Sequence, residues 1–317
     1  MRARANDDVA DDPGLALRRV VPPRMIFSDW RAADGWTLRR FDWPAKGEAR
    51  GSLLFLGGRG DFVEKYLEAL HHWHGQGWSL AGFDWRGQGG SGRMLDDPLI
   101  CHLDSFDPLL GDLEEFVAAW QAEAPAPHVI AAHSMGAHLT LRLIAERGKR
   151  IDAAVLLAPM IGLKSAPAGF IRMLGAGAIA AGRGRRRIWE GDIGNVGGRM
   201  TTSPERTEDK LWWKAQRPGI ASGAPSWGWL NAAARSIVAA RAGLKRLPGD
   251  VPLLMLASAQ DPVIDIGAVR RLAARLPQAQ FRLYPGRSHE LLREADGVRL
   301  EVLARIDRFV SAAIRKS

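Results

Sequence analysis

A serine lies between two small residues where a short apolar run gives way to a helical pattern. The segment is AAHSMGA, residues 131–137, with Ser134 at its centre. A hydroxyl at the apex of a sharp strand-to-helix turn can act as a nucleophile, and small residues two positions before and after it let the turn close. Ala132 and Gly136 meet that need. An ordinary helix cap would also favour serine, so this segment by itself predicts either a nucleophile or a capping residue.

A carboxylate and an imidazole follow Ser134 in the order that such a nucleophile requires. Asp261 comes directly after the apolar run 252–258, and His289 follows the run 280–285. An acid and then a histidine, each after a later strand, are the expected partners of a serine at this kind of turn. We predict that His289 accepts the serine proton and that Asp261 orients the imidazole.

Three other residues could take these roles. Asp265 is an alternative acid, but it falls in a segment with a helical pattern. His133 and His138 are alternative bases. His133 should point away from its neighbour Ser134 along the strand, and His138 lies within the predicted helix. We therefore expect structural roles for all three.

Backbone N–H groups near the serine could bind the negative charge that develops on a substrate carbonyl. The N–H of Met135 begins the predicted helix and should face that charge. A second donor is expected from the glycine-rich segment 57–60, which follows the apolar run 52–56. The N–H of Arg59 is the expected donor, and that of Gly58 is the alternative.

The elements that must position these residues alternate along the chain. Short apolar runs bounded by turn residues predict strands, and apolar residues at three- and four-residue spacing predict helices between them. A hairpin is expected in residues 20–50, with Asp34-Gly35 at its turn. The fold class is therefore α/β, with a mostly parallel central sheet flanked by helices. Later strands are expected at 52–56, 78–84, 128–133, 153–159, 252–258 and 280–285, and helices at 62–76, 106–122, 136–147, 265–276 and 297–314.

The segment from about residue 162 to residue 235 interrupts this alternation and is rich in glycine, arginine and tryptophan. A structureless loop of that size is uncommon inside a compact domain. We predict that residues 1–317 form one domain and that this segment is a helical cap inserted into it. Apolar residues of the cap could line a channel for an acyl chain or simply pack the cap onto the sheet. They include Phe170, Ile171, Met173, Leu174 and Ile179.

Composition and charge exclude several classes of protein. The single cysteine, Cys101, excludes an internal disulfide and a cysteine-rich metal site. The histidines at 71, 72 and 74 do not share one helix face, so we expect a polar helix surface rather than a metal site. The net charge is +9, but the basic residues are scattered apart from Arg183 to Arg187, and no zinc-finger spacing accompanies them. We expect no nucleic-acid partner and no metal or organic cofactor.

Two segments bear on location. Residues 1–19 lack the apolar region of a signal peptide. The stretch Ala166 to Gly182 is interrupted by Arg172 and falls short of the roughly 20 apolar residues that span a bilayer. We expect a cytoplasmic protein. Arg183 to Arg187 follow an apolar stretch and could rest on an anionic membrane at its inner face.

These segments resemble the monoacylglycerol lipase and lysophospholipase group of α/β-hydrolases, which is often classed with serine aminopeptidases. The resemblance runs from about Asp34-Gly35 to His289-Glu290. The group's G-H-S-M-G motif is matched at 132–136 except for its first glycine, and its G-x-x-D-x-x-V segment is matched approximately at Asp261 and Val263. Its D-x-R-G-x-G-x-S segment is matched at 84–91 and its H-E-L-L segment at 289–292.

The resemblance implies the α/β-hydrolase fold and hydrolysis of an ester of a single acyl chain through an acyl-enzyme. The group's oxyanion loop usually opens with His-Gly, whereas Gly57 takes the histidine's place here. In the cap, the segment PSWGW at 225–229 is similar to the bacterial lysophospholipase branch. One rival is an aminopeptidase, which would need a cap carboxylate to bind the substrate's amine, and another is a non-catalytic lipid-binding protein of this fold. The available cap carboxylates are Glu190, Asp192, Glu205, Glu208 and Asp209.

Overall fold

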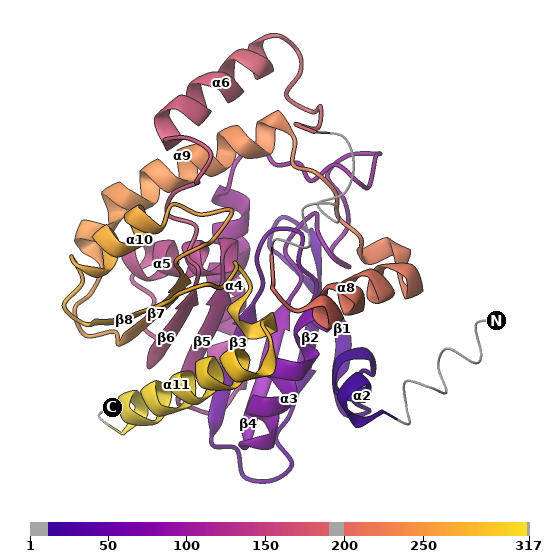
Figure 1. Ribbon diagram of the computed structural model, residues 1–317, viewed down its shortest axis with the longest axis vertical. Helices are drawn as coiled ribbons and strands as arrows, with labels where there is room; N and C mark the ends of the chain where they lie inside the picture. Colours follow the sequence, from indigo (N-terminus) through magenta and orange to yellow (C-terminus); the bar gives the residue numbers. More distant parts are fainter. Residues whose placement is uncertain (1–11, 190–199, 316–317) are drawn as a thin grey trace.

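An eight-stranded sheet runs through the molecule in the order β1-β2-β4-β3-β5-β6-β7-β8 (Figure 1). The computed structural model describes residues 12–189 and 200–315. Every pairing from β4 across to β8 is parallel, whereas β2 is antiparallel to both of its neighbours. The predicted fold class is confirmed. The strands are β1 Ile26–Arg31, β2 Thr37–Trp43, β3 Gly51–Leu56, β4 Trp78–Phe83, β5 His128–His133, β6 Ala153–Leu157, β7 Leu253–Ser258 and β8 Ala279–Tyr284.

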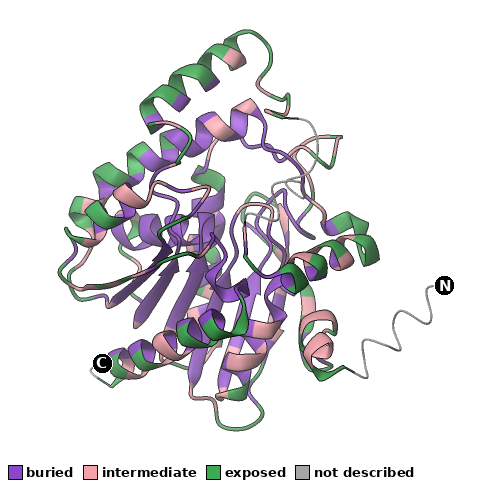
Figure 2. Cartoon of the chain, in the orientation of Figure 1, coloured by how far each residue is buried: buried purple, intermediate pink, exposed green. Residues whose placement is uncertain are grey.

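Helices cover both faces of the sheet because its central strands bury side chains on both faces. In β3, Leu54 and Leu56 belong to one core cluster, while Leu53 and Phe55 belong to the other. This is the two-residue alternation of a strand. The first cluster includes side chains of α4 (Asp107–Glu123), α5 (Met135–Arg147) and α10 (Ile266–Ala273). The second includes those of α3 (Leu67–Gly75) and α11 (Asp296–Ile314). Figure 2 shows the central strands buried and many exposed residues on the outer helices.

The predicted strands and helices outside the inserted segment are present, with small differences at their ends. The helix expected over 62–76 begins as a 3₁₀ turn, η1 (Val63–Tyr66), before α3. The strand expected over 153–159 ends at Leu157, because Ala158 adopts a positive φ of 47° and Pro159 follows it. The Asp34-Gly35 turn lies between β1 and β2, and Gly35 has a φ of 86° there. Short 3₁₀ helices also occur at η2 (Pro218–Ile220), η3 (Leu244–Arg246) and η4 (Leu291–Arg293).

One helix near the N-terminus was not expected from the sequence. α2 (Pro13–Arg19) is capped by Asp12, whose carboxylate accepts hydrogen bonds from the N–H groups of Gly14 and Leu15 at 2.7 and 3.1 Å. Its seven residues give only two helical turns, which is too short for an apolar periodicity to show. The capping residue and the following proline were the signals that could have revealed it.

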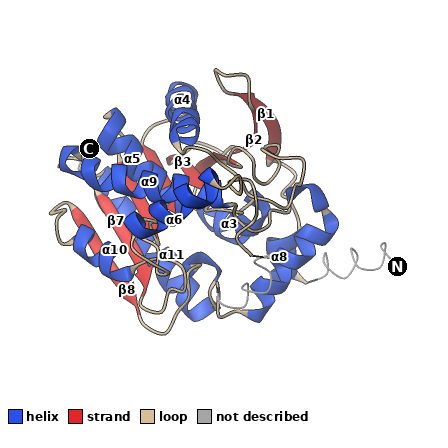
Figure 3. Cartoon of the chain, turned by 90° about the horizontal axis from the view of Figure 1, so that it is seen from above, coloured by secondary structure: helices blue, strands red, loops and turns tan. Residues whose placement is uncertain are grey.

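In the described part of the chain between β6 and β7, the α-helices are α6 (Ala168–Ala180), α8 (Pro204–Gln216) and α9 (Trp227–Gly243). Figures 1 and 3 show α6 and α9 side by side beyond one end of the sheet, with α8 on the side of α2. α6 approaches α9 closely at Gly175, where a Cβ atom would lie 2.7 Å from the Cβ of Asn231. α9 continues past the end predicted for the insertion at residue 235.

Candidate active site

Ser134 occupies a strained turn between β5 and α5. Its φ of 51° and ψ of −109° are unfavourable for a residue with a side chain. Hydrogen bonds to the neighbouring strand hold the turn: the Ser134 N–H donates to the Leu157 carbonyl at 2.8 Å. The Ser134 carbonyl accepts from the N–H of Met160 at 3.2 Å and that of His138 at 3.0 Å. The strain is therefore built into the junction of two central strands, and it presents the side chain at the sheet's edge.

Close backbone contact explains the small residue two positions after the serine. A Cβ atom on Gly136 would lie 2.6 Å from the carbonyl oxygen of Gly57 and 2.8 Å from that of Leu56. Only glycine permits the first turn of α5 to approach β3 this closely. Ala132, where the resembling group has glycine, lies fully buried in the core, so the fold accommodates its methyl group.

The side chains of Ser134, His289 and Asp261 form a continuous chain of hydrogen bonds. His289 Nε2 lies 3.0 Å from Ser134 Oγ, and His289 Nδ1 lies 2.6 Å from Asp261 Oδ2. Because a carboxylate can only accept, Nδ1 carries the proton and Nε2 is left to accept the proton of the serine hydroxyl. The three residues are 6%, 2% and 1% exposed, respectively. The structure thus brings together three residues that are far apart in the sequence.

The other oxygen of Asp261 is also satisfied. Its Oδ1 accepts hydrogen bonds from the N–H groups of Val263 at 2.7 Å and Ile264 at 3.0 Å. Burial alone would raise the pKa of Asp261, but the charge of His289 and these hydrogen bonds outweigh it and hold the pKa below its usual value. Burial alone would lower the pKa of His289, but the Asp261 carboxylate outweighs it and the pKa lies above its ordinary value. The pair therefore favours a charged acid beside an imidazole that can take up a proton.

The alternative acid and bases have other partners, although His133 belongs to the wall of the same pocket as Ser134. Asp265 caps α10 by accepting a hydrogen bond from the Ala268 N–H at 3.0 Å. His138 is fully buried against Ser236 at 2.6 Å, and burial lowers its pKa to about 3. His133 contacts Tyr66 and lies beside the His289 ring, with their centroids 4.7 Å apart. Each of them has the surroundings of a structural residue.

Two backbone N–H groups near the serine are open to a substrate. Neither Arg59 nor Met135 donates its N–H to another residue in the part of the chain that the structure describes. The alternative donor is engaged, because the Gly58 N–H donates to Asp61 Oδ2 at 2.7 Å. A Cβ atom on Gly58 would lie 3.0 Å from that of Ser134, so this loop passes directly beside the hydroxyl-bearing residue. The N–H groups of Arg59 and Met135 are the two suited to bind an oxyanion.

The segment 84–91 supports this loop, a role that sequence reasoning missed. Trp85 Nε1 donates to the Gly57 carbonyl at 2.8 Å, and the Gly60 N–H donates to the side-chain oxygen of Gln88. Asp84 accepts a hydrogen bond from the Val63 N–H at 3.0 Å. The D-x-R-G-x-G-x-S match was an available signal for Asp84 only, because Trp85 and Gln88 occupy variable positions of that motif.

A buried polar network lies on the other side of the loop and was also missed. Asp61 accepts from the Lys65 ammonium and from Tyr66 Oη, the latter at 2.8 Å. Lys65 also pairs with Glu290 at 2.6 Å. His133 Nδ1 lies 3.0 Å from Tyr66 Oη. The network joins the loop that follows β3 to the residue directly after His289, and so fixes both relative to Ser134.

A pocket of about 380 Å³ includes Ser134 and His289 in its wall. Much of the rest of the wall is apolar and comes from the loops after β6 and β7 and from α9. These apolar residues are Met160, Leu163, Pro262, Val263, Trp229 and Leu230. Such a pocket can hold an apolar chain beside the hydroxyl.

The α6 residues expected to line an acyl channel lie elsewhere. Phe170, Met173, Leu174 and Ile179 are exposed, and none of them is part of this pocket. The reason is that α6 packs along the outside of α9 and turns only a narrow face inward, with Ile171 buried on it. Of the two roles considered for these four residues, neither lining a channel beside Ser134 nor packing the cap onto the sheet fits their exposed positions.

The residues that the structure describes contain no group of three or more histidine, cysteine or acidic side chains placed to hold a metal ion. His72 pairs with Asp307 at 2.8 Å. His74 is buried and stacks on Trp43 with the ring centroids 4.0 Å apart. The expectation of a polar surface was therefore wrong for His74, because α3 packs it against β2.

Comparison with known proteins adds to this geometry. The family model described as "Serine aminopeptidase, S33" matches residues 47–296. Lysophospholipase L2 of Escherichia coli is 29% identical over 281 residues, which cover 81% of this chain and 79% of that protein. The "probable lysophospholipase L2" of Haemophilus influenzae is 25% identical over 278 residues, covering 83% of this chain and 84% of that protein.

Solved structures share the fold. A monoglyceride lipase from Saccharomyces cerevisiae aligns with a TM-score of 0.74 at 18% identity, covering 93% of this chain and 98% of that one. The monoacylglycerol lipase of Paleococcus ferrophilus aligns with a TM-score of 0.68 at 18% identity, covering 86% and 98%. At these identities the likeness establishes the architecture, and the chemistry must be argued from the site.

Proposed function

The chain belongs to the serine aminopeptidase S33 family, and we propose that it is a serine hydrolase that cleaves the ester of a single acyl chain. Ser134 is the nucleophile, His289 the base and Asp261 the residue that orients the base. The observation that carries this proposal is the pair of hydrogen bonds made by His289, at 3.0 Å to Ser134 and 2.6 Å to Asp261. The apolar pocket beside them supports an acyl substrate.

The reaction proceeds in two steps that these residues can perform. Ser134 Oγ attacks the ester carbonyl while His289 Nε2 takes its proton, and the N–H groups of Met135 and Arg59 bind the oxyanion. The intermediate collapses to an acyl-serine as His289 passes the proton to the departing alcohol. Water then attacks the acyl-serine with His289 again as base, which releases the fatty acid and restores the hydroxyl.

Relatives named for lysophospholipase and monoglyceride lipase activity support an ester over a peptide. The carboxylates in the pocket wall, Asp61 and Glu290, are both paired with Lys65 and so are not free to bind a substrate's amine. Asp209 is paired with two arginines, and Glu205 and Glu208 are exposed and lie outside the pocket wall. The other two cap carboxylates considered, Glu190 and Asp192, lie outside the described residues. A non-catalytic binding protein would have no use for the complete set of serine, histidine and aspartate.

The segment of about 162–235 serves as the cap of this site in our proposal. Trp189 and Lys210 from this segment, and Trp229 and Leu230 at the start of α9, are part of the pocket wall. Residues on the inserted helices therefore decide what fits beside the ester, while the sheet edge supplies the chemistry.

The test is a comparison of substrates with wild-type protein and the Ser134→Ala variant. We expect hydrolysis of p-nitrophenyl esters and monoacyl lipids to exceed that of aminoacyl anilides, and the variant to lose about 10⁴- to 10⁶-fold in kcat. A wild-type enzyme that prefers the anilides would overturn the choice of ester. A variant that keeps most of the esterase activity would overturn the choice of nucleophile.

We further propose that α6 rests on an anionic membrane. Phe170, Met173 and Leu174 follow one face of the helix at three- and four-residue spacing and are 48%, 60% and 45% exposed. Arg183, Arg185 and Arg186 are exposed just beyond the end of the helix. Apolar side chains beside basic ones suit the interface of an anionic bilayer, where each basic residue contributes about 1 kcal/mol.

Within the described ranges, 12–189 and 200–315, no helix combines the length and apolar character needed to cross a bilayer. The proposed contact is therefore peripheral and made by the surface of α6. A cytoplasmic location at the inner face of the membrane stays a prediction.

A further inference from the structure

Among the residues that the structure describes, three lysine and arginine side chains belong to the wall of the Ser134 pocket, and two of them have partners. Lys65 lies between the carboxylates of Asp61 and Glu290. The Arg59 guanidinium donates to the Gly223 carbonyl at 3.1 Å and lies over the Trp229 ring, 5.5 Å from its centroid. The third cation is Lys210 on α8.

The ammonium group of Lys210 makes neither a hydrogen bond nor an ion pair with any residue that the structure describes. It is partly buried, so its ammonium group has lost part of its hydration without gaining a partner in exchange. Burial of this kind disfavours the charged form unless an anion is present. A pocket that contains such a group is suited to a substrate that brings the anion with it.

The surroundings of Lys210 bring its pKa close to neutral pH. Burial, with the charges of Lys65, Lys214 and Arg293, lowers the pKa of Lys210 to about 7, while Glu290 acts in the opposite direction. Glu290 is itself paired with Lys65 and Arg293. An anion bound beside Lys210 would raise this pKa and draw the lysine fully into its charged form.

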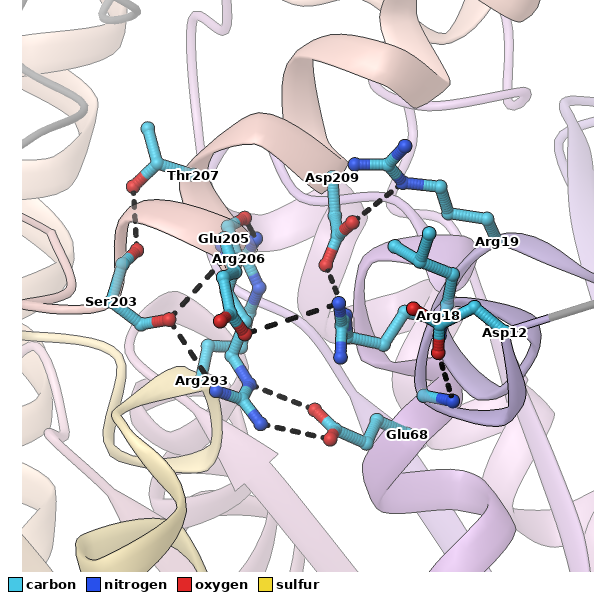
Figure 4. Close-up of polar contacts among 12 residues, drawn as sticks. Asp12, Arg18, Arg19, Glu68, Ser203, Glu205, Arg206, Thr207, Asp209 and Arg293 are labelled. Carbon is cyan, nitrogen blue, oxygen red and sulfur yellow. Dashed lines mark hydrogen bonds and ion pairs between the residues drawn. The ribbon is translucent and has the colours of Figure 1, made fainter. Parts of the chain in front are cut away.

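The position of Lys210 is fixed by its neighbours on α8. Figure 4 shows the Asp209 carboxylate between Arg18 and Arg19 of α2, with both distances at 2.6 Å. One turn earlier, Arg206 forms a two-pronged ion pair with Glu68 of α3, with both hydrogen bonds at 2.8 Å. α8 is thus fastened to the body of the protein through buried ion pairs on one side, while Lys210 faces the pocket.

We propose that Lys210 recognises a negatively charged phosphoester on the alcohol side of the substrate, next to the ester that Ser134 attacks. This inference rests on the proposed function and narrows it to an acyl ester with an anionic head group, as opposed to a neutral glyceride. Glu290, the carboxylate that acts on this charge, is already paired with Lys65 and Arg293, so the substrate's phosphate supplies the partner that Lys210 lacks among the described residues. Lys210 acts in substrate specificity and takes no part in bond breaking.

The experiment compares two substrates that differ only in the phosphate: monodecanoylglycerol and decanoyl-lysophosphatidic acid. The readout is the ratio of kcat/KM for the phosphate-bearing ester to that for the neutral ester. We expect Lys210→Met to lower this ratio about ten- to a hundredfold, as for loss of a hydrogen bond to a charged group. Lys210→Arg, which keeps the charge, should restore most of it.

The matched control is Lys245→Met, which removes an exposed positive charge on η3 that lies outside the pocket wall and is not among the charges acting on Lys210. It should leave the ratio within about twofold of wild type, as expected for a side chain outside the site. The rate at which a fluorophosphonate labels Ser134 gauges whether the site is intact in each variant, and Lys210→Gln replaces Lys210→Met if that variant fails to fold. A ratio that Lys210→Met does not change, or that Lys245→Met lowers equally, would overturn the role of Lys210. A wild-type protein that hydrolyses neither ester would instead overturn the proposed function itself.

Discussion

Ser134 and Lys210 face the same pocket, but the two regions that carry them are built differently. Ser134 lies at a junction of central strands, in a strained turn whose backbone is tied to β6 and whose next turn admits only glycine. Lys210 lies on α8, a helix between β6 and β7 that is joined to the rest of the protein by the ion pairs of Asp209 and Arg206 and by the buried side chain of Trp213. One region is held by backbone contacts in the core, the other by side-chain contacts that include largely buried ion pairs.

This difference implies that the catalytic residues and the residues that select the substrate lie in separate regions of the protein. Close-packed backbone contacts tolerate little change, which suits groups that must keep hydrogen-bond geometry during a reaction. Helices fastened by side chains can change their inward-facing residues without disturbing the sheet. We therefore expect substitutions at the sheet edge to affect every substrate and substitutions on the inserted helices to affect only the choice of substrate or surface.

The largest effect among the predictions here is expected for Asp261→Asn. The asparagine carbonyl would accept the N–H groups of Val263 and Ile264, which leaves its NH₂ facing His289 Nδ1. Nδ1 would then have to accept, so Nε2 would carry the proton and could not take one from Ser134. We expect kcat to fall about 10³- to 10⁴-fold for every ester tested, as with a wrong tautomer. Asp265→Asn is the matched control, because asparagine still caps α10 and activity should change less than about twofold.

If Asp261→Asn preserves the hydrolysis of one ester and abolishes that of another, the proposed division between catalytic residues at the sheet edge and specificity residues on the inserted helices is wrong.

The second prediction concerns pH. His289 must be neutral to act as a base, and its pKa lies above the ordinary value because the Asp261 carboxylate outweighs the effect of burial. We expect kcat/KM for an uncharged ester to fall about tenfold per pH unit below that pKa. In Asp261→Asn the residual activity should show this limb at lower pH, because burial remains and the carboxylate charge is gone. Steady-state rates across the pH range check both statements. If activity falls over the same pH range in Asp261→Asn as in wild type, the assignment of Asp261 as the partner of His289 is wrong.

The smallest effect is expected on α6. Met173→Ser removes an exposed apolar side chain, so it should weaken sedimentation with phosphatidylglycerol vesicles about three- to tenfold without changing the turnover of a dissolved short-chain ester. Leu300→Ser, on the exposed face of α11, should leave vesicle binding unchanged. Wild-type protein that fails to sediment with these vesicles at low salt would remove the membrane proposal, and equal losses in both variants would show that α6 has no special part in it.

The sheet and the positions of Ser134, Asp261 and His289 could be predicted because local sequence patterns indicate them. Apolar runs marked the strands, and the chain order of serine, acid and histidine placed their side chains at one edge of the sheet. The choice between Arg59 and Gly58 could not be made from the sequence, since it depends on the hydrogen bond from the Gly58 N–H to Asp61. In the structure this hydrogen bond engages the Gly58 N–H, which supports Arg59 as the donor in our proposal.

The roles of the inserted helices were harder to predict from the sequence. α6 has the composition of a buried helix, yet it packs on the outside of α9, and nothing in its own sequence says which of its faces is covered. Lys210 stands among the many charged residues of α8, and only the fold shows that Asp209 faces α2 while Lys210 faces the pocket. Such roles depend on long-range packing, which no local spacing encodes.

The central claim is that the hydroxyl of Ser134 forms the acyl-enzyme. The most direct measurement is mass spectrometry of wild-type protein quenched during turnover of a slowly hydrolysed p-nitrophenyl ester, followed by peptide mapping. We predict one acyl group, attached to Ser134, that is absent from Ser134→Ala and accumulates less in His289→Ala. An acyl group on any other residue, or continued turnover by Ser134→Ala at the wild-type rate, would contradict the account.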